Sequence, residues 1–350
     1  MVTCGFKQVT KWDIATGKAT RHFQGHNWLV KVVAFSPDGK FLVSGGSQVI
    51  KCWALQAKQN PEVILGPENL DYGFAFDLSP DGTFIASGAS SKSPSGVWNI
   101  NTRTVEFDLP SQDITRVAFS PDGAHLVSSG ASEVRIYDVN TKRVLYSKKH
   151  ARMFTVFHGF SPDGKLLLFS TPKGVIELRN ATDMKLAATF EGHEKQVADV
   201  QFFPDGKSMV SIGFDKTVRL WDLDSKKQKS VIAEKVQGSD LIILDRGKKI
   251  GWLDESRRLI VWDLETKSRA QKIATGETLS DDELAISPDG KTAAYAHWSI
   301  QSSELVLLNA ITGEPVARFF QSDDASIRFL KFSDDGKSLI AITSKNSVLI

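Results

Sequence analysis

A few polar side chains in this sequence have the type and spacing to bind a metal ion. His22 and His26 lie four residues apart, a spacing that suits a transition-metal site on a helix, and carboxylate pairs occur at Asp281–Asp282 and Asp323–Asp324. The histidines fall on an expected strand and on the turn after it, so they are not expected to converge. The aspartate pairs are expected in neighbouring loops, either as an acidic patch that attracts a basic partner or a cation, or as solvated loops, which we favour.

Motifs of the common enzyme classes are absent. The sequence has no Gly-x-Ser-x-Gly elbow, no Gly-x-x-x-x-Gly-Lys-Ser/Thr phosphate loop and no His-Glu-x-x-His zinc motif. We therefore expect a protein that is not an enzyme, with no catalytic residue, no resident metal and no cofactor.

The charge and composition also exclude several partners. The 43 basic and 41 acidic residues leave a formal charge of +2, and no run of eighteen apolar residues occurs. The basic clusters Lys148–Arg152 and Lys226–Lys229 are not interleaved with exposed aromatic residues, so we expect solvated strand edges rather than a nucleic-acid site. Two cysteines, Cys4 and Cys52, form no disulfide framework, and no secretory leader is evident. We expect a cytoplasmic protein that contacts neither membrane nor nucleic acid.

A repeated turn organises the whole chain. Eight copies of a motif related to Ser-Pro-Asp-Gly end at glycines separated by 43, 41, 41, 42, 41, 43 and 46 residues. These glycines are Gly39, Gly82, Gly123, Gly164, Gly206, Gly247, Gly290 and Gly336. Short runs of apolar residues flank each turn, so the period predicts units of four antiparallel strands. Each unit is too small to bury its own apolar face, so the units must stack on one another.

One repeat carries a set of residues with a known pattern. It contains Gly192 and His193, the turn Phe203–Gly206, then Ser211, Asp215 and the pair Trp221–Asp222. This pattern resembles the WD40-repeat family of β-propellers. The resemblance implies that His193, Ser211, Asp215 and Trp221 form a buried structural hydrogen-bond chain.

The other repeats depart from this pattern in part. Tyr137–Asp138, Leu178–Arg179 and Leu308–Asn309 are expected in place of the Trp-Asp pair. Apolar burial is expected to stabilise those repeats instead of the hydrogen-bond chain.

The repeat count predicts an all-β fold, a β-propeller of four-stranded antiparallel blades, with eight blades in a single WD40-like domain over residues 1–350. Both ends of the sequence fall inside a blade, and Lys18–Phe23 is expected to supply the fourth strand of the last blade, which leaves Met1–Lys11 as surplus strands. Seven blades plus a spare, or an open fragment of a longer array, are the alternatives. The regular repeats also resemble those of large bacterial WD40 proteins, so a segment of such a protein is expected.

The resemblance implies a non-catalytic scaffold for protein–protein interaction, whose partners are other proteins or fused domains of a longer parent chain. In this family partners dock around the mouth of the channel, on loops that enter the first strand or join the second and third strands. The candidate partner-binding residues in those loops are Trp28, Tyr72, Arg152, Met153, Phe214, Trp298, Asp281, Asp282, Asp323 and Asp324. The alternative is a propeller enzyme, a lactonase-like hydrolase with a metal in the central channel.

Overall fold

The computed structural model of this chain describes residues 2–4, 8–12, 19–24, 30–35, 41–46, 50–54, 62–65, 72–89, 95–102, 104–110, 114–130, 133–149, 156–234, 236, 241–253, 259–273, 284–287, 289, 291–298, 303–309, 312, 314–321, 327–332 and 339–343. The chain divides into two compact units. The central unit is His26–Glu191, and the terminal unit joins Met1–Gly25 to Gly192–Ile350.

The described elements of the central unit are short strands. They are β4 (Val30–Phe35), β5 (Phe41–Gly46), β6 (Ile50–Ala54), β7 (Glu62–Leu65), β8 (Tyr72–Leu78), β9 (Phe84–Ala89), β10 (Gly96–Asn99), β11 (Thr104–Asp108), β12 (Ile114–Phe119), β13 (His125–Gly130), β14 (Glu133–Asp138), β15 (Arg143–Lys149), β16 (Val156–Phe160), β17 (Leu166–Ser170), β18 (Ile176–Asn180) and β19 (Leu186–Phe190).

The described elements of the terminal unit are strands and one 3₁₀ turn. They are β1 (Val2–Cys4), β2 (Gln8–Trp12), β3 (Ala19–Gln24), β20 (Val197–Phe202), β21 (Ser208–Gly213), β22 (Thr217–Asp222), β23 (Lys227–Glu234), β24 (Leu241–Leu244), η1 (Asp245–Gly247), β25 (Lys249–Leu253), β26 (Leu259–Asp263), β27 (Ser268–Ile273), β28 (Leu284–Ile286), β29 (Thr292–Trp298), β30 (Ser303–Asn309), β31 (Pro315–Gln321), β32 (Ile327–Phe332) and β33 (Leu339–Thr343).

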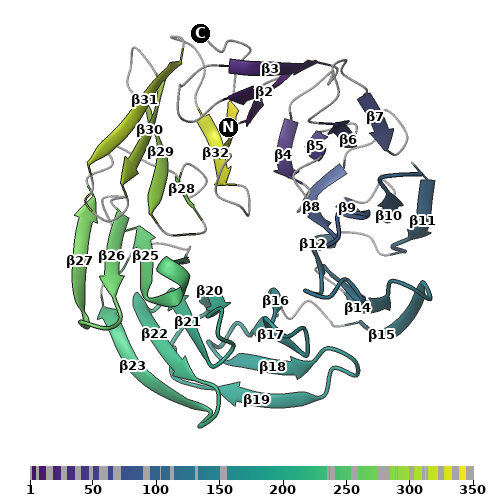
Figure 1. Cartoon of the computed structure of the whole chain (residues 1–350). Coiled ribbons are helices and arrows are strands. Elements are labelled where there is room, and N and C mark those ends of the chain that lie inside the picture. Colours follow the sequence, from purple (N-terminus) through teal and green to yellow (C-terminus); the bar gives the residue numbers. More distant parts are fainter. Residues whose placement is uncertain are drawn as a thin grey trace. The chain divides into compact units, whose positions relative to one another are not determined.

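These strands pair into small sheets, one after another along the chain (Figure 1). In the described residues the central unit has four four-stranded sheets. The terminal unit has three four-stranded sheets and one five-stranded sheet. Within each four-stranded sheet, consecutive strands are antiparallel neighbours, as in the hairpins β20·β21, β21·β22 and β22·β23. The predicted all-β fold of four-stranded antiparallel sheets is therefore confirmed.

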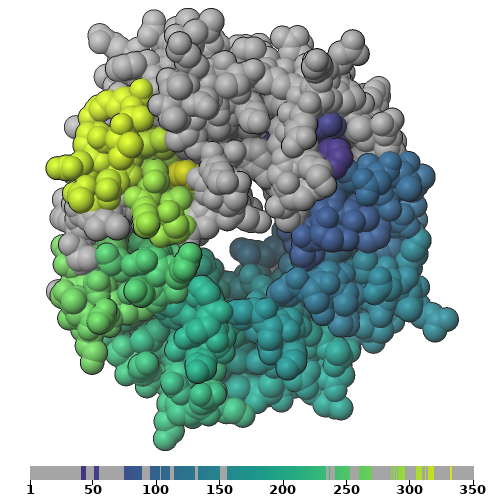
Figure 2. Space-filling view, viewed as in Figure 1, coloured from purple at the N-terminus to yellow at the C-terminus, as the bar shows by residue number. Residues whose placement is uncertain are grey.

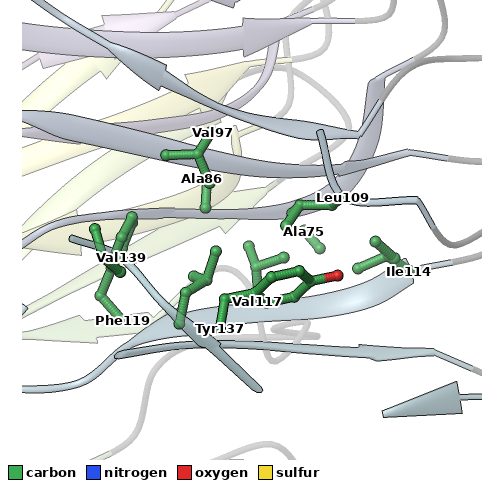
Figure 3. Close-up of a cluster of buried hydrophobic side chains, with 10 residues drawn as sticks. Ala75, Ala86, Val97, Leu109, Ile114, Val117, Phe119, Tyr137 and Val139 are labelled. Carbon is green, nitrogen blue, oxygen red and sulfur yellow. The ribbon is translucent and has the colours of Figure 1, made fainter. Parts of the chain in front are cut away.

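The core of each unit consists of apolar side chains from adjacent sheets. In the central unit, Ala86 and Val97 come from the sheet β8–β11, and Leu126 and Tyr137 come from the sheet β12–β15; all four are buried in one cluster. Figure 3 shows this cluster, with the Tyr137 ring lying beside Val117. Since each sheet supplies only part of the cluster, neighbouring sheets stabilise one another, as the small repeat size predicts.

The repeated turn has a common hydrogen-bond pattern. The Ser161 hydroxyl donates to Asp163 Oδ1 at 2.6 Å and accepts the Leu166 backbone N–H at 2.9 Å, while the Gly164 N–H bonds to the Ser161 carbonyl at 2.8 Å. Gly164 has φ of +72°, which glycine adopts without steric cost. The turns at Ser79, Ser120 and Ser287 repeat the serine–aspartate bond at 2.5–2.6 Å. Hydrogen bonding from the serine is the main cause that lowers the pKa of Asp122, Asp163 and Asp289 below the usual 3.8.

The register corrects one assignment made from the sequence. Leu167 pairs with Arg179, as Met209 pairs with Trp221, and both Leu167 and Met209 lie three residues after the glycine of the turn. Arg179–Asn180, not Leu178–Arg179, therefore takes the place of the Trp-Asp pair in this sheet. The assignment was wrong because it matched the apolar Leu178 to tryptophan, whereas the distance from the turn determines the pairing.

The N-terminal strands join the last sheet of the terminal unit. The order of this sheet is β3-β2-β1-β33-β32, and β1 pairs with β33 in parallel through Val2↔Ile340, Thr3↔Ala341 and Cys4↔Ile342. Both β1 and β33 match the second strand of a repeat, so they run in the same direction. Lys18–Phe23 was expected as the fourth strand of the last blade, and this position is wrong: β3, which covers Ala19–Phe23 of that segment, is the fifth strand counted from β32. The reason is that β1 pairs with β33 and β2 lies between β1 and β3, so the surplus strands are inserted in the same sheet. Among the described residues, no helix has the length and apolar character needed to cross a membrane.

Candidate functional site

Four side chains of the sheet β20–β23 form a buried chain of hydrogen bonds. Trp221 Nε1 donates to Ser211 Oγ at 2.7 Å, and Ser211 Oγ lies 2.7 Å from His193 Nε2. His193 Nδ1 lies 3.0 and 2.9 Å from the two carboxylate oxygens of Asp215. The chain therefore runs from Trp221 at the end of β22, through Ser211 on β21 and His193 in the loop before β20, to Asp215 in the turn between β21 and β22.

The protonation state of this chain follows from its partners. A neutral His193 with its hydrogen on Nδ1 donates to Asp215 and accepts the Ser211 hydroxyl, which leaves Ser211 Oγ free to accept from Trp221. Burial lowers the pKa of His193 below its usual 6.5, although the Asp215 carboxylate opposes this shift. Burial raises the pKa of Asp215, but hydrogen bonds from Thr217, the Glu194 backbone and His193 outweigh it, so this pKa lies below 3.8.

The hydrogen-bond chain joins two surface segments, the loop Glu191–Gln196 and the turn Gly213–Lys216. The Glu194 N–H donates to Asp215 Oδ2 at 3.0 Å, and the Phe214 N–H donates to the Gln196 carbonyl at 2.9 Å. A Cβ at Gly213 would lie 2.5 Å from His193 Nδ1 and 2.7 Å from Asp215 Oδ1, so only glycine leaves room for this contact. The two segments are thus held in one fixed arrangement.

An exposed aromatic side chain lies on these segments. Phe214 has 55% of its surface exposed, although most phenylalanines of folded proteins are largely buried. The exposed residues Glu194, Lys195 and Lys216 come from the same two segments. We call these four residues the Phe214 surface. Residues 192–234, which include this surface and its supporting sheet, are all described and are coloured in Figure 2.

Most of the candidates named from the sequence lie outside the described part of the chain. Trp28, Arg152, Met153, Asp281, Asp282, Asp323 and Asp324 are outside the described residues. Tyr72 lies at the start of β8 and Trp298 at the end of β29, and only their backbone is described. Phe214 is the candidate whose side chain is described. Its role in binding stays a prediction.

Two polar residues of the hydrogen-bond chain were not identified from the sequence. The Thr217 hydroxyl donates to Asp215 Oδ1 at 2.8 Å, and Arg219 Nε donates to Thr217 Oγ1 at 2.9 Å. Both residues alternate with buried residues on β22, and alternation alone indicates solvent exposure rather than a bond to a buried carboxylate. Within the described residues, no group of three or more His, Cys, Asp or Glu side chains is arranged to hold a metal ion.

A family model described as "WD domain, G-beta repeat" matches residues 17–54, 102–138 and 184–222. The last match contains the whole chain from His193 to Trp221. This protein belongs to the WD40-repeat family. The predicted recognition is therefore confirmed, while a bacterial origin stays a prediction.

The relatives agree with this family. Apoptotic protease-activating factor 1 of Danio rerio is 25% identical over 233 residues, which are 66% of this chain and 18% of that protein. The WD repeat-containing protein SL1-17 of Schistosoma mansoni is 26% identical over 220 residues, 61% of this chain and 71% of that protein. The chain thus spans only a small part of the zebrafish relative, and that protein's activity is not carried over.

A solved structure supports the fold. The C-terminal WD40 domain of Sif2 has a TM-score of 0.72 with this chain and covers 90% of it, and the match takes in 93% of that domain. The identity is 17%, so this likeness concerns the fold alone.

Proposed function

We propose that this WD40 protein is a non-catalytic protein-interaction module and that the Phe214 surface is one of its docking sites. WD40 proteins commonly act as interaction scaffolds, and WD40-repeat relatives are typically non-catalytic. The partner would be another protein or a fused domain of a longer parent chain.

The observation that carries the proposal is the exposure of Phe214 on a rigid support. Aromatic residues supply much of the binding energy at protein interfaces, and a fixed backbone lowers the entropy that is lost on binding. The buried chain of His193, Ser211, Asp215 and Trp221 fixes the two segments that carry Phe214, Glu194 and Lys216. An aromatic side chain with a mixed-charge rim matches the composition of a protein interface.

A site-specific crosslinker tests the proposal. A photoreactive phenylalanine analogue at position 214 is expected to give a discrete protein adduct that excess unlabelled wild-type protein abolishes and excess Phe214→Ala protein does not. The matched control places the same analogue at Val316 on β31, which is 66% exposed. Equal adducts at both positions, or competition by the Phe214→Ala protein, would contradict the proposal.

We also infer that the sheets are the blades of one eight-bladed propeller and that residues 1–350 form a single domain. Eight sheets in the described residues and the sharing of a sheet by β1 and β33 support this inference. An experimental structure that shows seven blades or an open array would contradict it, as would two separate unfolding transitions.

A further inference from the structure

The outer strand β15 of the central unit carries an unusual set of exposed side chains. Val144 and Leu145 are 48% and 44% exposed, and Val105 on the outer strand β11 of the preceding sheet is 54% exposed. These are three of the seven large hydrophobic side chains that are exposed in the described residues. Lys142, which directly precedes β15, forms an ion pair with Glu106 on β11, with 2.5 Å between Lys142 Nζ and Glu106 Oε2. A fourth exposed apolar residue of this unit, Leu186, lies on the outer strand β19, so β15 is distinguished by carrying two such residues next to each other.

The same strand is the most basic outer strand described. Arg143, Lys148 and Lys149 are all exposed, and β15 contains no acidic residue. The neighbouring outer strand β11 contains Glu106 and Asp108 and no basic residue. We call Arg143, Val144, Leu145, Lys148 and Lys149 the β15 surface.

The acidic residues of the paired strand β14 are already engaged. Glu133 Oε1 accepts from Arg135 Nε at 2.8 Å and from the Ser147 hydroxyl at 2.7 Å. Asp138 Oδ1 accepts the Thr141 backbone N–H at 2.7 Å. Burial, the largest influence, raises the pKa of Glu133. The hydrogen bonds from Arg135 and Ser147 and the positive charges of Arg135 and Lys149 outweigh it, so this pKa is lowered. The register places Asp138 opposite Arg143 and Glu133 opposite Lys149, and with four basic and two acidic residues β14 and β15 together keep a formal charge of +2.

The backbone of β15 has an open side. In the described residues β15 is the last strand of the order β12-β13-β14-β15. Its register with β14 shifts between Ile136↔Tyr146 and Tyr137↔Val144, so Leu145 is the extra residue of a bulge. Lysines on an edge strand prevent pairing with other sheets, and this protective role explains Lys148 and Lys149. The same role does not explain why two adjacent aliphatic residues, Val144 and Leu145, are exposed between Arg143 and Lys148.

From these observations we propose that the β15 surface binds an extended, acidic segment of a partner protein, which adds to β15 as a further strand. The backbone of the segment bonds to the open side of β15, as in other cases of strand addition. Its carboxylates pair with Arg143, Lys148 and Lys149, and its apolar side chains cover Val144 and Leu145. This surface shares no residue with the Phe214 surface, and the proposal does not depend on that surface.

Fluorescence anisotropy with a labelled decapeptide in which Glu alternates with Val tests this proposal. The wild-type protein is expected to bind this peptide and not the matching Lys–Val peptide. The double change Lys148→Glu and Lys149→Glu should weaken binding at least tenfold, and Val144→Ser with Leu145→Ser should weaken it severalfold. Thermal melting establishes that each variant is folded.

A matched control uses a second basic outer strand. Lys227→Glu with Lys229→Glu on β23 changes the same net charge and should leave the affinity within twofold. Phe214→Ala should also leave it unchanged, so failure of the Phe214 surface and failure of this proposal are distinguishable. If the β23 variant weakened peptide binding equally, the proposal would be overturned, because the loss of affinity would then follow from the changed net charge of the protein and not from β15. A single-stranded oligonucleotide that displaces the peptide and binds more tightly would assign the surface to nucleic acid instead.

Discussion

The indole of Trp221 donates to the hydroxyl of Ser211 across the β21·β22 pair at 2.7 Å, and both side chains are almost completely buried. A buried N–H that loses its partner costs more free energy than the bond contributes when formed. Loss of either partner is therefore expected to destabilise the sheet β20–β23.

Replacement of Ser211 by alanine is expected to lower the free energy of unfolding by about 2–4 kcal/mol, since both Trp221 Nε1 and His193 Nε2 lose their partner. Urea denaturation measures the change. The control is Ser208→Ala at the half-buried start of the same strand, for which we expect a change within about 0.5 kcal/mol. Equal effects of the two substitutions would show that the chain contributes no stability of its own.

Acid should destabilise the protein through His193. Its pKa is lower in the folded state than the usual 6.5, so the unfolded state binds a proton more readily. The contribution of His193 to the free energy of unfolding is fully present above about pH 6.5 and decreases as the pH falls below that value. Asp215, whose pKa is also lowered, adds a further loss as the pH falls below its usual 3.8.

Thermal melting between pH 7.5 and pH 5 measures the effect of His193. The wild-type melting temperature should fall more steeply than that of a His193→Gln variant, in which the titrating group is absent. Parallel curves for the two proteins would contradict the assigned direction of the pKa shift.

Gly213→Ala should destabilise the protein by about 1–3 kcal/mol, because the new methyl group overlaps His193 and Asp215. The substitution separates the two segments that carry Phe214, so crosslinking from position 214 should decrease as well. A stable Gly213→Ala protein with full crosslinking would show that the contact between His193 and Gly213 does not position the surface.

The turns offer a graded comparison. Asp163 accepts hydrogen bonds from the Ser161 hydroxyl and the Lys165 N–H. In the turn of Asp205, Phe203 takes the place of the serine and has no hydroxyl to donate, and Asp205 accepts the Lys207 N–H. Asp163→Ala is expected to cost about 1 kcal/mol and Asp205→Ala about half as much. Chemical denaturation of the two variants checks this order, and a larger effect at Asp205 would refute it.

Part of the candidate site could be predicted from the sequence, through its resemblance to the WD40-repeat pattern. The matching residues are His193, Ser211, Asp215 and Trp221. Ser211 and Trp221 lie on β21 and β22, whereas His193 and Asp215 lie in the loop before β20 and in the turn after β21. Thr217 and Arg219 could not be predicted to join them, since their alternation on β22 indicates solvent. The exposure of Phe214 also depends on how two loops separated in sequence meet.

The sequence by itself determined the repeat, the strands and the turns, because proline, aspartate and glycine act on the backbone within four residues. Only the tertiary structure decided that Arg179 stands opposite Leu167, that β1 lies parallel to β33, and that Val144 and Leu145 are exposed. Strand register, strand neighbours and burial are properties of pairs distant in the chain. Local residue preferences do not encode which of several similar strands will be the partner.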